Sequence, residues 1–220
     1  MEAGMNIVFD LDGTLIDSAP DIHAAVAKML ADEGREALDL VTVTSFIGNG
    51  LPKLVERVIV RAGMDLADHP RLTKATLDHY NAASADLTRP FPGVIAALSA
   101  LQDAGHQMAV CTNKPVAPAR DILRDLGLEV FFTTVVGGDS LAVTKPDPAP
   151  LHACVVALGG GATIYVGDSE VDAATAAAAK VPFALFTEGY RKTPVEDLPH
   201  DATFSDFHAL PALLNDMAGG

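Results

Sequence analysis

Two acidic residues near the start of the chain, Asp10 and Asp12, stand where an apolar run meets a glycine. The run Met5–Phe9 precedes them and Gly13 follows. A strand that ends at Asp10 points this carboxylate at the carboxyl edge of a sheet, where open α/β sheets bind their ligands. Asp12 lies on the same side, because side chains repeat with a period of two until the chain turns. Two carboxylates at such an edge can divide the work of a nucleophile and a proton shuttle.

Polar residues also follow two later apolar runs. Thr112 and Asn113 come after one of them, and Pro115 suits the first turn of the helix that would follow. A helix start leaves free backbone N–H groups, so this turn could bind an anion, with the Thr112 hydroxyl and the Asn113 N–H on a phosphoryl oxygen. Lys145, after the next run, is a compact charge suited to phosphate. Taken alone, each signal is more typical of an ordinary turn or a solvated loop lysine.

A second acidic pair follows the fourth apolar run. Asp168 stands at its tip and Asp172 one helical turn later, so both could face the edge that Asp10 and Asp12 occupy. Mg²⁺ prefers one or two carboxylates with waters and substrate phosphate, which matches Asp10, Asp168 and the backbone carbonyl of Asp12. Locally, Asp168 or Ser169 as a helix N-cap and Asp172 as a first-turn acid explain the same residues. They do not explain four acids at one edge, so the concurrence of these signals favours a catalytic site.

The elements that must position these residues alternate along the chain. Strand-like runs alternate with helical patterns, which indicates a Rossmann-like α/β core with a parallel sheet. The expected strands are 5–10, 107–112, 133–137, 163–167 and 183–187, and the expected helices are 93–104, 116–126, 148–158 and 170–179. A further helix-like stretch, from Phe204 to Met217, is expected to pack on this core.

Residues 20–86 break the alternation, because helix follows helix with no convincing strand. We therefore expect a small all-helical domain inserted after the first strand, with boundaries near Ser18 and Thr88. Pro90 and Gly93 punctuate the return into the core. The expected domains are an α/β core of residues 1–17 and 88–220 and a helical insertion of residues 18–87.

The composition argues against several classes of protein. The 220 residues carry a formal net charge of −14, and nucleic-acid binding relies on clustered Lys and Arg, so no nucleic-acid partner is expected. No apolar run approaches the about 20 residues that span a bilayer, so no membrane partner is expected. Cys111 and Cys154 form no CxxC pattern and no signal peptide opens the chain, which favours the cytoplasm. Phosphate chemistry here would rest on a bound cation and a few basic side chains.

Four groups of residues resemble the motifs of the haloacid dehalogenase superfamily of aspartate-nucleophile phosphotransferases, and the resemblance covers essentially the whole chain. The groups are Asp10-Leu11-Asp12-Gly13-Thr14, Thr112, Lys145 and Gly167-Asp168. The resemblance implies that Asp10 attacks phosphorus to form a phosphoaspartate, and that Asp12 is the general acid and base. It also implies that Thr112 and Lys145 hold the phosphoryl group. The implied Mg²⁺ ligands are Asp10, Asp12 and Asp168, with Ser169 and Asp172 in support.

Within that superfamily, dehalogenases lack the second acid because expelling halide needs no proton, so Asp12 favours phosphoester chemistry. The helical insertion resembles the small cap that closes over the site, excludes water and reads the leaving group. Several stretches resemble the phosphoglycolate phosphatases in particular, which implies hydrolysis of 2-phosphoglycolate to glycolate. They are Asp17–Ile22, Gly48–Arg57, Phe91–Val94, Cys111–Pro115 and Gly137–Asp139.

The glycine-bracketed segment of the insertion supplies candidate substrate-binding residues, namely Gly48, Asn49, Lys53 and Arg57. Lys53 and Arg57 stand at helical spacing and could bring a cation to a substrate carboxylate, or could belong to a solvated helix face. The segment Glu188-Gly189-Tyr190, after the fifth expected strand, could line the entrance.

Three other activities are compatible with the same motifs. A β-phosphoglucomutase-like mutase shares every core motif, and so does a broad sugar- or nucleotide-phosphate phosphatase. A non-catalytic phosphoacceptor module, similar to a response-regulator receiver, also places acids, a Thr or Ser and a Lys around Mg²⁺, although the cap and Asp12 weigh against it. In the enzymatic interpretations the partner is a small phosphorylated metabolite, and the protein is expected to be a monomer or homodimer.

Overall fold

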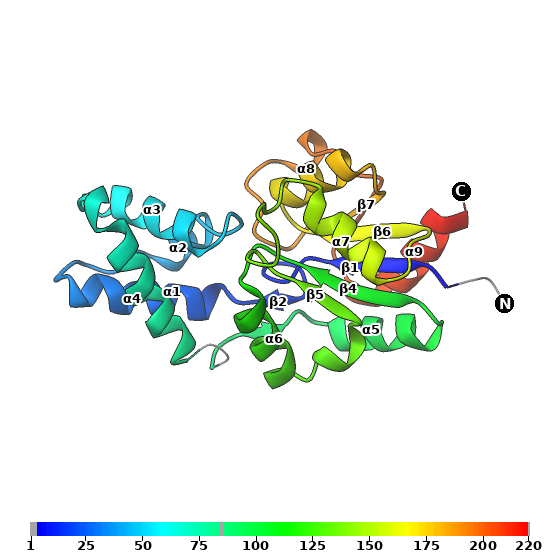
Figure 1. Cartoon of the computed structure of the whole chain (residues 1–220), viewed down its shortest axis with the longest axis horizontal. Helices are drawn as coiled ribbons and strands as arrows, with labels where there is room; N and C mark the ends of the chain where they lie inside the picture. Colours follow the sequence, from blue (N-terminus) through cyan, green and yellow to red (C-terminus); the bar gives the residue numbers. More distant parts are fainter. Residues whose placement is uncertain (1–3, 84–85, 220) are drawn as a thin grey trace.

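The computed structural model describes residues 4–83 and 86–219, which form a parallel sheet flanked by helices and a helical domain beside it (Figure 1). The strands of the sheet are β1 (Asn6–Phe9), β4 (Gln107–Cys111), β5 (Thr134–Val136), β6 (Thr163–Gly167), β7 (Phe183–Phe186) and β8 (Ala202–Phe204). They pair in the order β5-β4-β1-β6-β7-β8, and each neighbouring pair is parallel. The predicted α/β fold with a parallel sheet is confirmed.

One strand of this sheet, β8, is absent from the expected elements. Phe204, expected within a terminal helical stretch, ends this strand and pairs with Phe186 of β7. Of its three residues only Phe204 is buried, so β8 shows no apolar run, whereas β5, which is equally short, contains the buried pair Val135 and Val136. A 3-10 turn at Phe207–Ala209 follows, and the terminal helix starts only at Leu210, whose side chain is buried in the core as expected.

Helices cover both faces of the sheet. On one face lie α5 (Val94–Asp103), α6 (Val116–Asp125) and α9 (Leu210–Gly219), and on the other α7 (Ala149–Ala157) and α8 (Glu170–Ala179). Ile7 and Phe9 of β1 enter the first apolar core, and Val8 enters the second. Strands buried on both faces read as continuous apolar runs, which is why these segments are visible in the sequence.

A separate helical domain, hereafter the cap, follows β1 in the sequence. It consists of α1 (Ala19–Asp32), α2 (Leu40–Thr44), α3 (Leu51–Arg61), a 3-10 turn at Leu66–Asp68 and α4 (His69–Asn81). These helices enclose their own apolar cluster, to which α3 contributes the stripe Leu54, Val55, Val58 and Ile59. Residues 18–83 and 86–87 contain no strand, so the predicted all-helical insertion is confirmed. Its boundaries stay a prediction, and residues 84–85, 1–3 and 220 of the expected domains lie outside the described residues.

A two-stranded ribbon joins the cap to the core. β2 (Ile16–Asp17) pairs antiparallel with β3 (Arg89–Pro90). Asp21, buried in the first turn of α1, accepts hydrogen bonds from the backbone N–H groups of Leu87 and Thr88. The outgoing and returning segments of chain are therefore held side by side, at the point where the sequence indicates a hinge.

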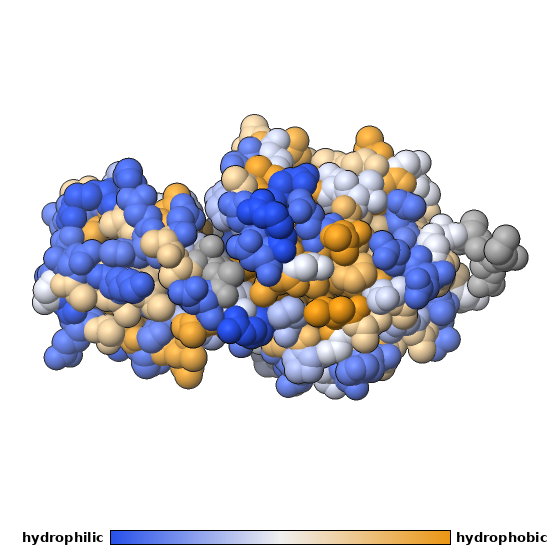
Figure 2. All heavy atoms as spheres, turned by 90° about the horizontal axis from the view of Figure 1, so that it is seen from below, coloured by the Kyte–Doolittle hydropathy of each residue, from blue (hydrophilic) through white to orange (hydrophobic). Residues whose placement is uncertain are grey.

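The surface differs between the two domains. On the face shown in Figure 2, hydrophilic residues dominate the cap and hydrophobic residues gather over the core. In the described part of the chain, no helix is both long and apolar enough to cross a bilayer. Two short 3-10 turns complete the core, at Glu129–Phe131 and Val195–Asp197. The described part of the chain begins and ends on the side of the core away from the cap (Figure 1).

Candidate active site

Three adjacent strands bring the candidate residues to one edge of the sheet. Asp10 follows β1, Thr112 follows β4 and Asp168 follows β6, and β1 lies between the other two strands. Lys145 comes from the loop between β5 and α7, and its Nζ lies 2.8 Å from Asp10 Oδ1. Parallel topology therefore assembles residues that are far apart in the chain, at the edge where such sheets bind ligands.

Lys145 is buried at the centre of this edge and is not a solvated loop lysine. Its Nζ contacts Asp172 Oδ1 at 2.7 Å and the Tyr165 hydroxyl at 2.9 Å, in addition to Asp10. Burial alone would lower the pKa of Lys145, but the carboxylates of Asp10 and Asp172 outweigh it and raise the pKa above its ordinary value. A charged ammonium therefore faces Asp10.

Asp10, Asp168 and Asp172 form an oxygen-rich cluster, in which one carboxylate oxygen from each lies within 4.8 Å of the others. Burial, and then the nearby Asp172, raise the pKa of Asp10 to about 7, and the same two causes raise the pKa of Asp168 well above its ordinary value. Among these three carboxylates Lys145 supplies one positive charge. A divalent cation would offset the remaining repulsion, and the all-oxygen donor set fits a hard metal ion.

Protein donors occupy both oxygens of Asp172, and more of them bond to it than to Asp168. Oδ1 accepts from Lys145 and from the Tyr165 hydroxyl, and Oδ2 accepts from the Ser169 hydroxyl at 2.6 Å and from the backbone N–H of Asp168. Ser169 is the N-cap of α8 and forms a capping box with Asp172. Burial opposes ionisation of Asp172, but Lys145 outweighs it and lowers the pKa. Ser169 and Asp172 thus cap a helix and also hold Lys145 and the turn that carries Asp168.

Two loops fix Asp168. Thr14 Oγ1 donates to its Oδ1 at 2.8 Å, and the Tyr190 N–H donates to its Oδ2 at 2.6 Å. Gly13, at φ +90°, passes so close that a Cβ there would lie 2.6 Å from Asp168 Oδ2. Glycine is therefore required after Asp12 by the approach of Asp168 as well as by the turn.

Asp12 is paired with a lysine that the sequence interpretation did not single out. Lys114 Nζ lies 2.9 Å from Asp12 Oδ1, and Ser18 Oγ donates to the same oxygen at 2.5 Å. The ammonium also lies over the ring of Tyr80 in α4, 4.7 Å from its centroid. Burial alone would lower the pKa of Lys114, but Asp12 outweighs it and raises the pKa. The signal that could have found Lys114 is its place two residues after Thr112, at the same strand tip.

Asn113 connects the core to the cap. Its Nδ2 donates to the backbone carbonyls of Gly48 at 3.1 Å and Lys145 at 3.0 Å. Thr112 is buried beside it, and its Oγ1 accepts from the Lys114 N–H at 3.2 Å. The structure therefore places Thr112, Asn113 and Gly48 together at the expected edge.

The start of α6 differs from the expectation. Pro115 precedes the helix rather than lying in its first turn, since α6 begins at Val116. The Val116 N–H donates to Asp139 Oδ1 at 2.7 Å, so this amide is not free for an anion. Binding of an anion at this edge therefore depends more on side chains, above all Lys145, and less on backbone N–H groups at the start of α6 than expected.

The structure does not bring Lys53 and Arg57 to the edge. Lys53 Nζ pairs with Glu56 Oε1 at 2.7 Å, and its side chain is 47% exposed. Arg57 donates to a backbone carbonyl and to Asn49 Oδ1, both at 2.8 Å. Among the described residues that line the two cavities at Asp10, Gly48 and Asn49 are present, whereas Lys53 and Arg57 are not.

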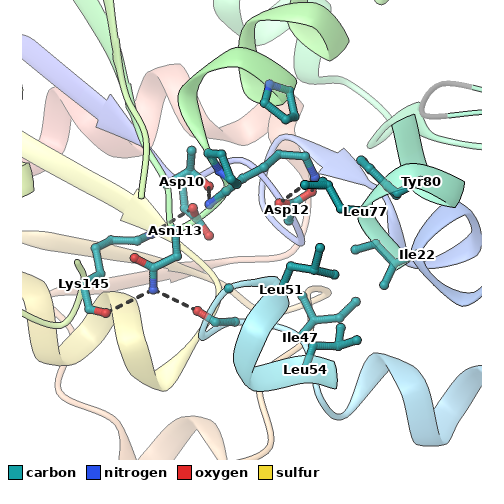
Figure 3. A pocket seen from close by; sticks show the side chains of 16 residues that line it. Asp10, Asp12, Ile22, Ile47, Leu51, Leu54, Leu77, Tyr80, Asn113 and Lys145 are labelled. Carbon is teal, nitrogen blue, oxygen red and sulfur yellow. Dashed lines mark hydrogen bonds and ion pairs between the residues drawn. The ribbon is translucent and has the colours of Figure 1, made fainter. Parts of the chain in front are cut away.

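Two cavities meet at Asp10 and Asp12. The smaller, of about 80 Å³, lies between the core and the cap, with polar core side chains on one side and mainly apolar cap side chains on the other (Figure 3). The larger, of about 360 Å³, lies over the acidic cluster and also reaches Tyr190, as the sequence interpretation allowed. The smaller cavity is lined by Asp10, Asp12, Thr112, Asn113, Lys114 and Lys145 from the core, and by Ile22, Ile47, Leu51, Leu54, Leu77 and Tyr80 from the cap.

Fold and site together define a class of enzyme, the hydrolases with a parallel-sheet core in which a helical cap covers an acidic cluster at the carboxyl edge of the sheet. The family model described as haloacid dehalogenase-like hydrolase matches residues 7–186, and the chain belongs to that family. The resemblance inferred from the sequence motifs is thereby confirmed.

Similar proteins narrow the class further. The phosphoglycolate phosphatase of Cereibacter sphaeroides is 52% identical over 213 residues, which cover 96% of this chain and 98% of that protein. A plasmid phosphoglycolate phosphatase of Cupriavidus necator is 44% identical over 94% of this chain and 92% of its own length. A crystal structure described as a predicted phosphoglycolate phosphatase from Haemophilus somnus 129pt matches with a TM-score of 0.91 and 29% identity, over 97% of this chain and 99% of that chain. The chain is a phosphatase, and its substrate is a small phosphorylated compound.

Proposed function

We propose that this phosphatase hydrolyses 2-phosphoglycolate to glycolate and inorganic phosphate through a phosphoaspartyl intermediate on Asp10. The observation that carries the chemistry is the buried contact of Asp10 with Lys145, 2.8 Å apart and beside Asp168. The names of relatives at 52% and 44% identity support the substrate. The small cavity supports it too, with about 80 Å³ against the about 300–1,000 Å³ of pockets for drug-sized ligands.

Mg²⁺ is the cofactor that we assign to the reaction. Asp10 and Asp168 would ligate the ion through their carboxylates and Asp12 through its backbone carbonyl, with Ser169 and Asp172 behind them. Two carboxylates and a carbonyl leave room for the waters and the substrate oxygen that Mg²⁺ keeps. When bound, the ion offsets the negative charge that the phosphate dianion brings to this acidic edge.

In the first half-reaction, the Asp10 carboxylate attacks phosphorus in line while Lys145 and Thr112 hold the phosphoryl oxygens. The bond between phosphorus and the ester oxygen breaks, and protonated Asp12 gives its proton to that oxygen, so glycolate leaves with a neutral hydroxyl group. The phosphoryl group is then carried by Asp10. Asp12 lines the same cavity as Asp10, which is consistent with this transfer.

In the second half-reaction, the Asp12 carboxylate takes a proton from a water that attacks the same phosphorus. The bond to the Asp10 oxygen breaks, which releases inorganic phosphate and restores both carboxyl groups to their starting states. The cap, with the boundaries 18–87, would exclude bulk water during these steps. Its separate apolar cluster and the ribbon of β2 and β3 support this division from a core of 1–17 and 88–220.

The remaining expectations form part of the same proposal. We place the enzyme in the cytoplasm, as a monomer or homodimer, without a nucleic-acid partner. The net charge of −14 supports the last point, because it repels a polyanion.

A substrate panel tests the proposed function. We expect Mg²⁺-dependent phosphate release with the highest kcat/KM for 2-phosphoglycolate among sugar phosphates and nucleotides, and its loss in Asp10→Asn. A higher value for another ester would favour a broad phosphatase, and isomerisation of a hexose phosphate would favour a mutase. Phosphorylation of Asp10 without turnover would favour the phosphoacceptor module.

A further inference from the structure

The smaller cavity contains a second buried lysine that the proposed phosphoryl chemistry does not use. Lys145 is held by Asp10, Asp172 and Tyr165, whereas Lys114 donates to the two oxygens of Asp12, at 2.9 and 3.2 Å. An ammonium has three N–H bonds, and the two oxygens of Asp12 take at most two of them. The Lys114 side chain is only 8% exposed and lines the cavity, so its ammonium lies in a site largely closed to solvent.

Tyr80 supplies a second unfilled polar group in the same cavity. The residue is 6% exposed, and its hydroxyl has no hydrogen-bond partner among the described residues. Buried polar groups are normally paired, so an unpaired one at a cavity marks a place for a ligand or water. Burial raises the pKa of Tyr80, so the phenol keeps its proton at neutral pH and can donate. Its ring lies under the Lys114 ammonium, which places the two donors together.

The remaining wall of the cavity is apolar on the cap side, where Ile22, Leu54 and Leu77 lie (Figure 3). A sugar would place several hydroxyl groups against these side chains, and each would lose its hydrogen bonds to water. A short methylene group fits such a wall, and the dry surroundings strengthen the attraction between an ammonium and an anion. The cavity is therefore matched to a short leaving group with one negative charge.

We propose that Lys114 and Tyr80 bind the carboxylate of the leaving group and so make this phosphatase selective for a short anionic alcohol. This inference rests on the proposed hydrolysis of 2-phosphoglycolate. Lys114 and Thr112 belong to one loop, and the Lys114 N–H bonds to Thr112 Oγ1 at 3.2 Å, so the phosphoryl site and the carboxylate site are held a short, fixed distance apart. Lys53 and Arg57 were expected to bind the substrate carboxylate, but neither lines the cavity. Lys114 does line it, and we assign this role to Lys114 instead.

Asn113 has a different role from this pair. Its Oδ1 is also buried without a partner among the described residues, but its Nδ2 is already bonded to the carbonyls of Gly48 and Lys145. The free atom is an acceptor and does not bind a carboxylate.

Two esters that differ only in the carboxylate test the inference. We would measure kcat/KM for 2-phosphoglycolate and for ethyl phosphate in the wild type, Lys114→Met, Lys114→Arg and Tyr80→Phe. Lys74→Met on α4, whose side chain is 75% exposed, is the matched control for loss of a lysine. The ratio of the two kcat/KM values should fall about 10- to 100-fold in Lys114→Met and about 3- to 10-fold in Tyr80→Phe, mainly through KM. Lys114→Arg should recover part of the ratio, and Lys74→Met should keep it.

The ratio separates the outcomes. If Lys114 only holds Asp12, both esters slow equally and the ratio stays constant in Lys114→Met, which overturns the inference. If Lys114→Met does not fold, Tyr80→Phe still decides, because it leaves the pair of Lys114 and Asp12 intact. A wild type that prefers 2-phosphoglycolate while both variants keep the ratio would leave the proposed function standing and the carboxylate site wrong. A wild type without that preference would instead refute the proposed substrate, and the carboxylate site with it.

Discussion

The acidic cluster predicts that the metal-free protein loses stability as the pH rises towards neutrality. Without a metal ion, burial and the nearby Asp172 raise the pKa of Asp10 from 3.8 to about 7. The folded protein therefore binds more protons than the unfolded chain between these two values, so the free energy of unfolding falls with rising pH in that window. Below pH 3.8 both states are protonated at this group, and above pH 7 both are ionised.

The size of the effect follows from the shift. One proton corresponds to about 1.4 kcal/mol per pH unit, so Asp10 alone should lower the free energy of unfolding by roughly 2–3 kcal/mol between pH 5 and pH 8. Asp168, whose pKa is also raised by burial and Asp172, acts in the same direction. A bound divalent cation favours the ionised carboxylates, so Mg²⁺ should add stability that grows with pH over the same window.

Urea denaturation at pH 5, 6, 7 and 8 tests this, with a chelator in one series and saturating Mg²⁺ in the other. In chelator, Asp10→Asn should reduce the fall in the free energy of unfolding between pH 5 and pH 8 by roughly 2–3 kcal/mol. Asp78→Asn, a change at an exposed acid on α4 with a 61% exposed side chain, is the matched control and should keep the wild-type slope. A stability in chelator that is flat or rises with pH, or a decline that Asp10→Asn retains in full, would refute this account of the cluster.

Substitutions at Lys145, Asp12 and Gly13 each test one part of the site. Lys145→Met leaves the buried Asp10 and Asp172 without their shared ammonium, so denaturation at pH 7 should show a loss of about 3–5 kcal/mol, and an unchanged midpoint would contradict the burial of these pairs. Asp12→Asn should slow the first half-reaction, measured as alcohol release in a single turnover, about 10²–10⁴-fold for 2-phosphoglycolate but much less for 4-nitrophenyl phosphate, whose leaving group needs no proton. The second half-reaction should slow for both esters, and equal losses in the first half-reaction would argue against a leaving-group acid. Gly13→Ala places a Cβ 2.6 Å from Asp168 Oδ2 and should displace that carboxylate. The Mg²⁺ concentration that gives half-maximal activity should therefore rise about 10- to 100-fold, and an unchanged concentration would mean that Asp168 is not a ligand.

The sequence predicts most of the core because its strands are buried on both faces. Continuous apolar runs mark β1, β4, β6 and β7, and the order of motifs then places Asp10, Thr112 and Asp168 at one edge. The edge strand β8 has no such run, because only Phe204 of its three residues is buried. Local pattern therefore finds the sheet that carries the site, but not its last strand.

Contacts between the domains are beyond what local pattern shows. The pair of Lys114 and Asp12 and the ring of Tyr80 meet only after the cap folds against the core, and no spacing in the chain relates them. Helical spacing does place Lys53 and Arg57 near each other on α3, but the buried stripe of that helix, which includes Leu54 and Val58, turns both toward other partners. Periodicity shows which residues share a face, and tertiary packing decides what that face meets.

The central claim is that Asp10 carries the phosphoryl group during hydrolysis of 2-phosphoglycolate. The most direct measurement is a rapid acid quench of wild-type enzyme with Mg²⁺ and 2-phosphoglycolate, followed by borohydride reduction and peptide mass spectrometry, since borohydride converts an acyl phosphate to homoserine. The account predicts homoserine at position 10, formed before phosphate is released and absent without substrate. Phosphate release at full rate with Asp10 unmodified at every quench time, or with the modification on another residue, would contradict it.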